Sequence, residues 1–404
     1  MAPLDRSAAE PLSGDEVELA RAATPGCADE LIHLNHAGSS LPPQVALDAQ
    51  LDHLVREATI GGYEAAAEAA GRSDDVYASI ARLIGADPLE IARAEHATAA
   101  WSAAFWSIPM RAGQRVITHD HDYGANQVAL LHAAERFGVV VERIPSDEHG
   151  QVDLDRLAAA LASPGDVAVV SLAWIPTSSG LVNPAAAVGE LTRAAGVPYL
   201  LDACQAVGQR SIDVDELGCD FLSATGRKFL RGPRGTGFLY ARRSILDRVT
   251  PSEPDHHGAD WVALDRYEFV DGARRFERWE HSVAGWLGLG AAVDVSLELG
   301  PARIEATITE RADELRALLG SAGMRVLDPG VERCGIVTFA HPTMAAGEVS
   351  AALRERGVNT SSTAPGSARA DLEARDVPPA VRMSVHVTTT PAELDRAVDA
   401  LPSR

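Results

Sequence analysis

The sequence predicts an α/β protein in which a large domain with a mostly parallel central sheet is followed by a smaller C-terminal α+β domain. The chain has 404 residues, and single hydrophobic cores rarely grow past about 250–300 residues. Apolar runs of strand length alternate with helical stretches between residues 115 and 241, which is typical of a parallel sheet covered on both faces. After about Gly300 the pattern changes to one long helical stretch followed by strand, helix, strand and helix.

Six apolar runs form the predicted central sheet, over residues 115–118, 139–144, 167–174, 198–203, 220–225 and 236–241. Residues 155–161 and 188–196 have the periodicity of amphipathic crossover helices, and Gly196 is expected to end the second one. Residues 48–84 have a helical pattern that is interrupted at Gly61 and Gly62. The first 30 residues are polar and alanine-rich, which is typical of a frayed lead-in with a short helix.

The C-terminal stretch predicts a helix over 302–323, a strand over 335–342, a helix over 347–357, a strand over 380–387 and a helix from residue 391. We therefore expect three parts. An N-terminal segment, 1–45, packs with the small domain. A large domain spans residues 46–298, and a small domain spans residues 299–404.

Composition excludes several classes of protein. The formal net charge of −21 should repel nucleic acid and anionic membranes, so that a phosphate-bearing ligand must be held by local donors. The N-terminus lacks the basic start and apolar stretch of a signal peptide, and no run of about 18 apolar residues indicates a membrane span. The cysteines are scattered, without a C-x-x-C pair. These features predict a cytoplasmic protein with reduced thiols.

One predicted strand ends on a carboxylate that needs a partner. Asp202 terminates the apolar run at 198–203, and Gln205 follows three residues later. An aspartate at such a junction is often the N-cap of a helix. A buried carboxylate needs compensation, however, and no lysine or arginine lies between Gly196 and Gln209. Open parallel sheets bind ligands at this end of their strands.

The following strand ends on a lysine. Thr225, Arg227 and Lys228 surround Gly226 in the sequence TGRK. A hydroxyl and a guanidinium on either side of a glycine suit a phosphate, and a desolvated lysine suits imine formation with an aldehyde. A lone lysine or arginine at a strand end is usually only solvated, and the loop GPRGTG matches neither the dinucleotide fingerprint nor the P-loop.

Taken in order, these motifs resemble the class V aminotransferase family of fold-type I enzymes that depend on pyridoxal 5′-phosphate (PLP). The resemblance rests on DACQ at Asp202 and on SATGRKF and GPRGTGFLY around and after Lys228, and it extends from LNHAGSS to VRMSVHVTTTPAELDRAV. That family includes cysteine desulfurases, isopenicillin N epimerase-like proteins and hercynylcysteine sulfoxide lyases. It implies PLP as cofactor and a homodimer with the active site at the subunit interface.

The resemblance also assigns roles to individual residues. Lys228 would hold PLP as a Schiff base, and Asp202 would keep the pyridine nitrogen protonated. Gln205 would hydrogen-bond the ring oxygen. Thr225 and Arg227 would hold the phosphate.

Two further stretches would complete the phosphate site. EHATAAW matches the family's helix-start phosphate site, with the amides of Ala97 and Thr98 and the Thr98 hydroxyl at the anion; an ordinary threonine N-cap is the alternative. RRFERWEHSVAG resembles the segment that reaches the cofactor of the neighbouring subunit. The family's phosphate-binding threonine is replaced there, which leaves Ser282 or His281.

The remaining matches concern the cofactor ring and the substrate. Tyr123, in HDHDYGANQ, takes the place of the histidine that desulfurases stack on the pyridine. Arg382 matches the arginine for the substrate α-carboxylate, although a strand arginine is more often a surface pair, and Asn35 is assigned to the substrate site. His119 and His121 form an H-x-H pair of the kind found in zinc sites, but no later ligand set is evident, so we expect no metal.

One departure distinguishes between subfamilies. Desulfurases carry a nucleophilic cysteine on a loop before the final strand, and the corresponding residues 358–378 contain none. Cys334, the nearest, is expected to pack in the core. We therefore expect β-elimination from a cysteine S-conjugate or its sulfoxide, as GGYEAAAEAAG and DYGAN look most like the hercynylcysteine sulfoxide lyase group. Transamination, or epimerisation or racemisation, of a specialised amino acid is the alternative. A non-catalytic PLP-binding regulator is a second one, but regulators usually carry a DNA-binding domain, for which this acidic chain has neither room nor charge.

Overall fold

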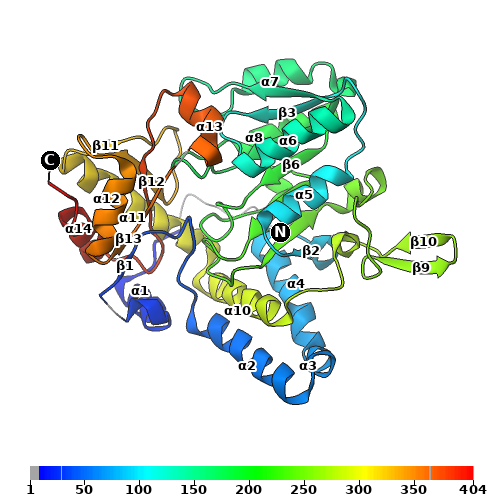
Figure 1. Ribbon diagram of the computed structural model, residues 1–404, viewed down its shortest axis with the longest axis horizontal. Helices are drawn as coiled ribbons and strands as arrows, with labels where there is room; N and C mark the ends of the chain where they lie inside the picture. The colour runs from blue at the N-terminus through cyan, green and yellow to red at the C-terminus, as the bar shows by residue number, and fades with distance from the viewer. Residues whose placement is uncertain (1–8, 29, 364, 404) are drawn as a thin grey trace.

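The computed structural model describes residues 9–28, 30–363 and 365–403, and a seven-stranded sheet forms its centre (Figure 1). The strand order is β2-β8-β7-β6-β5-β3-β4. The bounds are β2 Ile91–Ala94, β3 Arg115–His119, β4 Val140–Ile144, β5 Val167–Ala173, β6 Tyr199–Asp202, β7 Phe221–Thr225 and β8 Gly237–Ala241. Strands β3 to β7 run parallel to one another, whereas β8 is antiparallel to both of its neighbours. The predicted α/β fold with a mostly parallel sheet is confirmed.

Two strands differ from the simplest expectation. Only residues 226–236 separate β7 from β8, which is too short for a crossover helix, so β8 can only return antiparallel. Strand β2 was not predicted, because its four residues include Arg93 and are too few to give a clear pattern.

Alternate residues of the strands enter two separate cores. Leu200 packs in one core with α5 (Ala97–Ser107) and α6 (Gly124–Phe137). Its neighbours Tyr199 and Leu201 pack in the other, with α4 (Ala70–Ile84), α7 (Leu154–Leu161) and α8 (Ala185–Ala195). Both faces of the sheet are therefore covered, which explains why its strands are continuously apolar. Gly196 ends α8 with a φ of 66°, as predicted.

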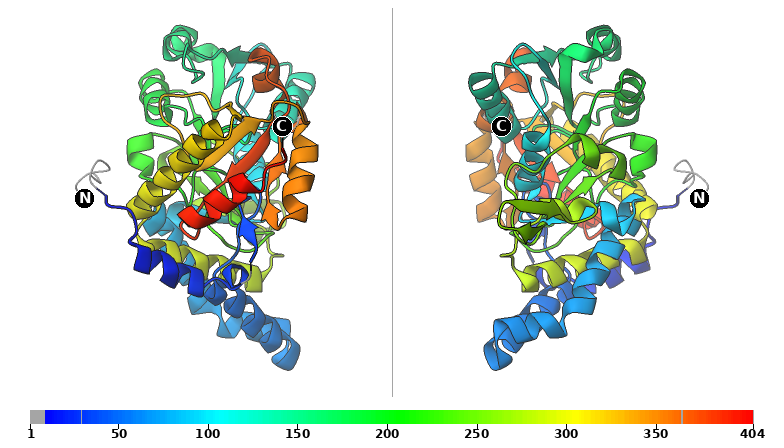
Figure 2. Two further views of the ribbon diagram at one scale, coloured as in Figure 1. Left: turned by 90° about the vertical axis from the view of Figure 1, so that its left-hand side faces the viewer. Right: turned by 90° about the vertical axis from the view of Figure 1, so that its right-hand side faces the viewer.

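The helical stretch before the sheet is interrupted as expected. Helix α2 (Gln44–Ile60) ends at Gly61, whose φ of 103° suits glycine, and α3 (Gly62–Glu68) leads into α4. Both side views show α2 and α3 projecting from one end of the body (Figure 2). Helix α10 (Val283–Leu299) is buried on most of its surface and packs against α2 and α4. A short helix, α9 (Val214–Leu217), precedes β7.

The C-terminal region contains a four-stranded antiparallel sheet in the order β11-β12-β15-β14. Helices α11, α12 and α14 lie in front of these strands in the left view of Figure 2. The bounds are α11 Pro301–Ser321, β11 Arg325–Val326, β12 Ile336–Ala340, α12 Ala346–Glu355, β13 Val358–Asn359, β14 Ser361–Ser362, α13 Pro365–Ala374, β15 Val381–Ser384 and α14 Pro391–Asp399. The predicted order of helix, strand, helix, strand and helix is present. Strands β11, β13 and β14 and helix α13 were not predicted.

The described part of the N-terminal segment contacts this C-terminal region. Strand β1 (Ile32–His33) pairs in parallel with β13. Helix α1 (Gly14–Ala22) begins at a capping box formed by Ser13 and Glu16, and Glu16 also pairs with Arg303 of α11. These contacts support our proposal that residues 1–45 pack with the small domain. Residues 1–8 of the expected frayed lead-in lie outside the described residues.

A two-stranded hairpin, β9 (Ala259–Ala263) and β10 (Arg266–Phe269), extends from the large sheet (Figure 1). Among the described residues no single helix is long and apolar enough to cross a membrane. Helices α10 and α11 would pass that test together by length and composition, but they meet at a bend of 81°.

Candidate active site

A cavity of about 320 Å³ lies at the carboxyl ends of β6 and β7. Most of the residues predicted for the site line it, namely Ala97, Thr98, Tyr123, Asp202, Gln205, Thr225, Arg227 and Lys228. The adjacent strands β5, β6 and β7 are parallel, so their carboxyl ends meet at one edge of the sheet. This explains how Asp202 and Lys228 come together.

Asp202 is buried without a basic partner at ion-pair distance among the described residues. Its Oδ1 accepts a hydrogen bond from the Cys204 amide and its Oδ2 accepts one from the Asn126 side chain, each at 2.9 Å. Burial raises the pKa of Asp202, while these two hydrogen bonds and the charge of Lys228 act in the opposite direction. No helix begins at Asp202, so the N-cap interpretation is wrong. The carboxylate lines the cavity and can accept from a cation placed there.

Lys228 is also buried in the cavity wall, with 8% of its surface exposed. Burial lowers the pKa of its amine, and the positive charges of Arg227 and Arg382 lower it further. A desolvated amine of this kind is neutral more often than an exposed lysine, which suits attack on an aldehyde. The Cys204 thiol lies beside this amine, and burial raises the pKa of the thiol.

The start of α5 forms an anion site at another part of the cavity. His96 is the N-cap and its Nδ1 accepts from the Ala99 amide at 3.0 Å, so the interpretation of Thr98 as an ordinary N-cap is wrong. Ala97 and Thr98 occupy the first turn, where amides have no partner within the helix. Thr225 lines the same cavity. A Cβ at Gly226 would lie 2.2 Å from the Thr236 hydroxyl, so only glycine fits between Thr225 and Arg227.

Gln205 presents an unpaired atom to the cavity. Its Nε2 donates to the Ala37 carbonyl at 3.2 Å and to the Thr177 hydroxyl at 3.3 Å. Its Oε1 is buried and has no partner among the described residues. Because the two ends of an amide are interchangeable by a flip, this end can donate to or accept from a bound group.

Arg382 lies behind the cavity wall rather than in it. Its Nη1 donates to the Thr177 hydroxyl at 2.7 Å and to the Thr177 carbonyl at 3.0 Å, and its Nε donates to Ser361 at 3.1 Å. Burial lowers the pKa of Arg382 to about 10, and the positive charge of Arg227 acts in the same direction. Arg227 in turn donates to the Gly38 carbonyl. The two positive charges repel each other, and neither guanidinium has a carboxylate at ion-pair distance among the described residues, an arrangement that attracts an anionic ligand.

Tyr123 lines the cavity and immediately precedes α6, with 39% of its surface exposed. The two neighbouring histidines have other partners. His119 Nε2 accepts from the Ala173 amide at 3.1 Å, and His121 Nδ1 lies 3.0 Å from Asp371. Within the described residues no cluster of three or more histidine, cysteine or acidic side chains could hold a metal ion.

Two predicted residues besides Arg382 do not line the main cavity. Ser282 is the N-cap of α10 and lines a separate cavity of about 30 Å³, which shares Gly235 with the main one. Asn35 forms a bridge to Ser384, and its backbone carbonyl accepts from Gly38 at 3.0 Å. Asn35 therefore shapes the turn whose carbonyl groups, at Ala37 and Gly38, accept hydrogen bonds from Gln205 and Arg227. The proposed roles of Ser282 and Asn35 remain predictions.

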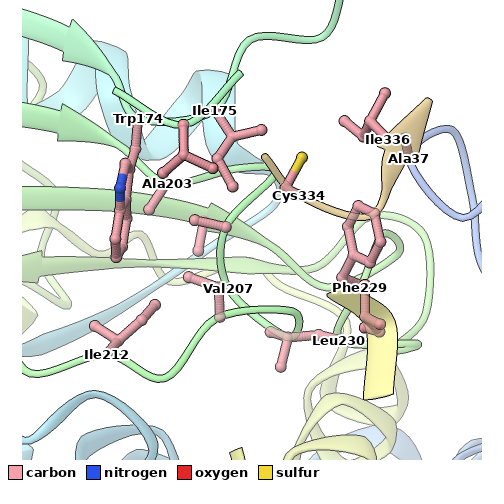
Figure 3. Packing of buried hydrophobic residues seen from close by; sticks show 14 of the residues in the cluster. Ala37, Trp174, Ile175, Ala203, Val207, Ile212, Phe229, Leu230, Cys334 and Ile336 are labelled. Atoms are coloured by element: carbon pink, nitrogen blue, oxygen red, sulfur yellow. The ribbon is translucent and has the colours of Figure 1, made fainter. Parts of the chain in front are cut away.

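None of the four cysteines lies within residues 358–378. Cys334 is 2% exposed and belongs to the main core, where it packs near Phe229 and Ile336 (Figure 3). Its expected role in core packing is confirmed. Burial raises the pKa of Cys334 to about 11 and that of Cys219 to about 12. Of the described cysteines, only Cys204 lines the main cavity.

Sequence reasoning missed several residues of the site. Asn126 donates hydrogen bonds to both Asp202 and Asp122. Its position on α6, three residues after Tyr123, was the signal that could have identified it. Thr177 lines the cavity and accepts a hydrogen bond from Arg382, but it lies in an irregular segment that has no helix or strand pattern in the sequence.

The donor set fits PLP. A pyridinium N–H is the cation that Asp202 lacks, and a phosphate suits the first turn of α5 together with Thr225. The buried amine of Lys228 and the unpaired Oε1 of Gln205 complete the set. The residues that carry these groups all line the same cavity.

Comparison with known proteins supports this description. Residues 32–397 match the family model described as aminotransferase class-V. The chain is 31% identical over 402 residues to a probable hercynylcysteine sulfoxide lyase of Mycobacterium tuberculosis (strain CDC 1551 / Oshkosh), covering 98% of this chain and 95% of that protein. It is 30% identical over 337 residues to an isopenicillin N epimerase of Streptomyces clavuligerus, covering 80% and 82%. The apo structure of a cysteine desulfurase from Thermococcus onnurineus NA1 superposes with a TM-score of 0.87 at 21% identity, covering 95% of this chain and 96% of that one. At that identity the likeness shows the fold.

Proposed function

Because this chain belongs to the class-V aminotransferase family of PLP-dependent enzymes, we propose that it is a C–S lyase that acts on a cysteine S-conjugate or its sulfoxide. The products are a thiol or a sulfenate, pyruvate and ammonia. The coarser description, a PLP enzyme of this family that acts on an amino acid, follows from the family itself.

The observation that carries the proposal is the absence of a usable sulfur acceptor. In the described part of residues 358–378, the segment that in desulfurases holds the nucleophilic cysteine is occupied by β13, β14 and α13 and contains no cysteine. Serine and threonine hydroxyls are far weaker nucleophiles than a thiolate at neutral pH. Cys204, the one thiol of the described residues that lines the cavity, is partly exposed, and desolvation raises its pKa, which lowers its thiolate fraction. A sulfur substituent on Cβ should therefore depart intact.

The residues of the cavity can carry out such an elimination. PLP, when bound, supplies the electron sink that stabilises negative charge at Cα. Asp202 would hold the ring nitrogen in its protonated form, and Arg382 would orient the substrate through its α-carboxylate. The amine of Lys228 would remove the Cα proton. The leaving group then departs from Cβ, and the aminoacrylate takes up water to give pyruvate and ammonium.

The decisive experiment is incubation of the purified holoenzyme with a panel of S-alkylcysteines and their sulfoxides. We expect pyruvate, ammonia and thiol or sulfenate in equal amounts, without a keto-acid acceptor. Free cysteine should give no protein persulfide by mass spectrometry. A variant in which all four cysteines are replaced by serine or alanine should keep most of this activity if it folds. A requirement for a keto acid with formation of a new amino acid, or a persulfide on Cys204, would contradict the proposal.

Similarity to an isopenicillin N epimerase keeps epimerisation as a second candidate. It requires that a proton return to Cα from the opposite face, and the hydroxyl group of Tyr123, which lines the cavity, could deliver it. Chiral chromatography of the same incubations separates the two functions. Recovery of the D-amino acid without pyruvate favours epimerisation.

We also propose that the chain forms a homodimer. Leu54 on α2 and Trp261 and Leu264 on the β9–β10 hairpin are 50%, 72% and 93% exposed. A groove of about 620 Å³ is lined by Tyr63 and Trp279 among others. Large exposed apolar side chains are often found at protein interfaces. Light scattering should give twice the mass of the chain, and a monomer at micromolar concentration would argue against the proposal.

A further inference from the structure

A kinked helix stands beside the cavity in the segment that carries the cysteine of desulfurases. Helix α13 packs against α6 and deviates from helical geometry at Ala368. The carbonyl oxygen of Gly366 would lie 2.5 Å from a Cβ at Gly124, so the absence of a side chain at Gly124 permits this close approach. Gly124 follows Tyr123 directly, so α13 borders the wall to which Tyr123 belongs.

Asp371 of α13 has no exposed surface and connects three parts of the chain. Its Oδ2 accepts from the Ser178 hydroxyl at 2.8 Å. Its Oδ1 lies 3.0 Å from His121 Nδ1. Arg375, directly after the end of α13, donates to both oxygens at 2.5 and 2.8 Å. Burial alone would raise the pKa of Asp371, but its bonds to His121 and Arg375 outweigh burial and hold it below its usual value, so the carboxylate stays ionised.

Two of these partners lead directly to the cavity. His121 lines the cavity two residues before Tyr123. Ser178 follows Thr177, which also lines the cavity and accepts hydrogen bonds from Arg382 and Gln205. The Asp371 carboxylate therefore contacts two parts of the chain at the cavity: it lies beside His121, and it bonds to Ser178, which follows Thr177. The groups proposed for the cofactor ring and phosphate, Asp202 and Thr225, have other supports: Asp202 bonds to Asn126 and Cys204, and Thr225 to Thr236.

We propose that Asp371 is a positioning residue for the substrate end of the site: it holds Thr177 in the place from which Thr177 orients Arg382. This proposal rests on the proposed function in one respect, the binding of the substrate carboxylate by Arg382. A buried ion pair is in itself weak support for stability, because desolvation offsets most of the attraction. His121 lines the cavity and Ser178 directly follows Thr177, which also lines it, and this placement points to a role in geometry.

The test uses the PLP-loaded enzyme and a ligand that does not react. The ligand 3-(propylthio)propanoate keeps the carboxylate and thioether of S-propylcysteine but lacks its amino group. We expect Asp371→Asn to weaken the binding of this ligand, measured by calorimetry, by about tenfold, or about 1.4 kcal/mol. With S-propylcysteine as substrate, KM should rise more than kcat falls. The dissociation constant of PLP should change by less than about twofold, since Asp202 and Thr225 keep their partners.

Two further variants control the experiment. Ser178→Ala removes only the hydroxyl that links Asp371 to the Thr177 turn and leaves every charge in place, so it should fold even if Asp371→Asn does not. We expect Ser178→Ala to weaken the binding of this ligand by about fivefold, the size expected for the loss of one hydrogen bond. Arg369→Ala removes an exposed ion pair with Glu373 on the same helix and should leave ligand binding unchanged.

Unchanged ligand binding in folded Ser178→Ala and Asp371→Asn, even with a lower melting temperature, would show that the cluster serves stability alone. A parallel loss of PLP affinity would also overturn the proposal, because the effect would then not be specific to the substrate end. Ligand binding needs no turnover. If no S-conjugate is cleaved, the proposed function fails while the calorimetry still decides the role of Asp371.

Discussion

Replacement of Asp202 by asparagine tests the cofactor-binding end of the site most directly. The substitution keeps the shape of the side chain and removes its charge. One oxygen of asparagine can still accept from the Cys204 amide, which now lies 2.9 Å from Oδ1. The new amide nitrogen would face the Asn126 Nδ2, which now donates to Oδ2 at 2.9 Å, so one hydrogen bond is lost.

The expected magnitude follows from the charge. Two opposite unit charges at about 2.8 Å interact by about 6 kcal/mol at an effective dielectric constant of about 20. Part of this interaction energy already stabilises the ground state. We therefore expect the substitution to remove about 3–5 kcal/mol of transition-state stabilisation, which lowers kcat by about two to four orders of magnitude. PLP should remain bound because Lys228 and the α5 phosphate site are unchanged.

The assay compares kcat and bound PLP in Asp202→Asn with those in Asp122→Asn. Asp122 is a buried carboxylate that shares Asn126 with Asp202, but it does not line the cavity. Burial raises its pKa to about 6. We expect Asp122→Asn to lose less than about tenfold in kcat, because only packing and hydrogen bonding change. Wild-type turnover in Asp202→Asn, or equal losses in the two variants, would refute the reasoning.

Three further predictions concern the lysine and the arginine. Borohydride reduction followed by peptide mapping should place the pyridoxyl group on Lys228, the only lysine in the sequence, and a reduced protein whose Lys228 peptide carries no pyridoxyl group would contradict the assignment. Because burial lowers the pKa of Lys228 below its ordinary value of 10.5, the neutral amine forms at lower pH. The rate of PLP uptake by the apoenzyme, followed by absorbance near about 420 nm, should therefore rise with pH and level off below pH 10.5. A rate that continues to rise past this pH would show an unshifted amine. Arg382→Lys should raise KM for amino-acid substrates by at least about tenfold, since lysine cannot reproduce the bonds to Thr177 and Ser361 while binding a carboxylate; an unchanged KM would place the carboxylate site elsewhere.

Several features of the fold could be predicted because they depend on local pattern. Continuous apolar runs between helices indicated strands buried on both faces, and Gly196 and Gly61 marked helix ends through their backbone freedom. The direction of β8 was decided by the length of the preceding loop rather than by its own residues. Strand β2 and the short strands β13 and β14 were missed because two to four residues are too few to show a period.

The sequence by itself determined the central part of the site. Asp202 and Lys228 each follow an apolar strand, and parallel neighbours in a sheet bring such ends to one edge, so the local pattern was sufficient. The tertiary structure alone decided which groups support them. Asn126 lies 76 residues before Asp202, and Ser178 lies 193 residues before Asp371. Hydrogen bonds between such distant positions leave no periodicity in a single sequence, because they depend on how helices and turns pack after the sheet has formed.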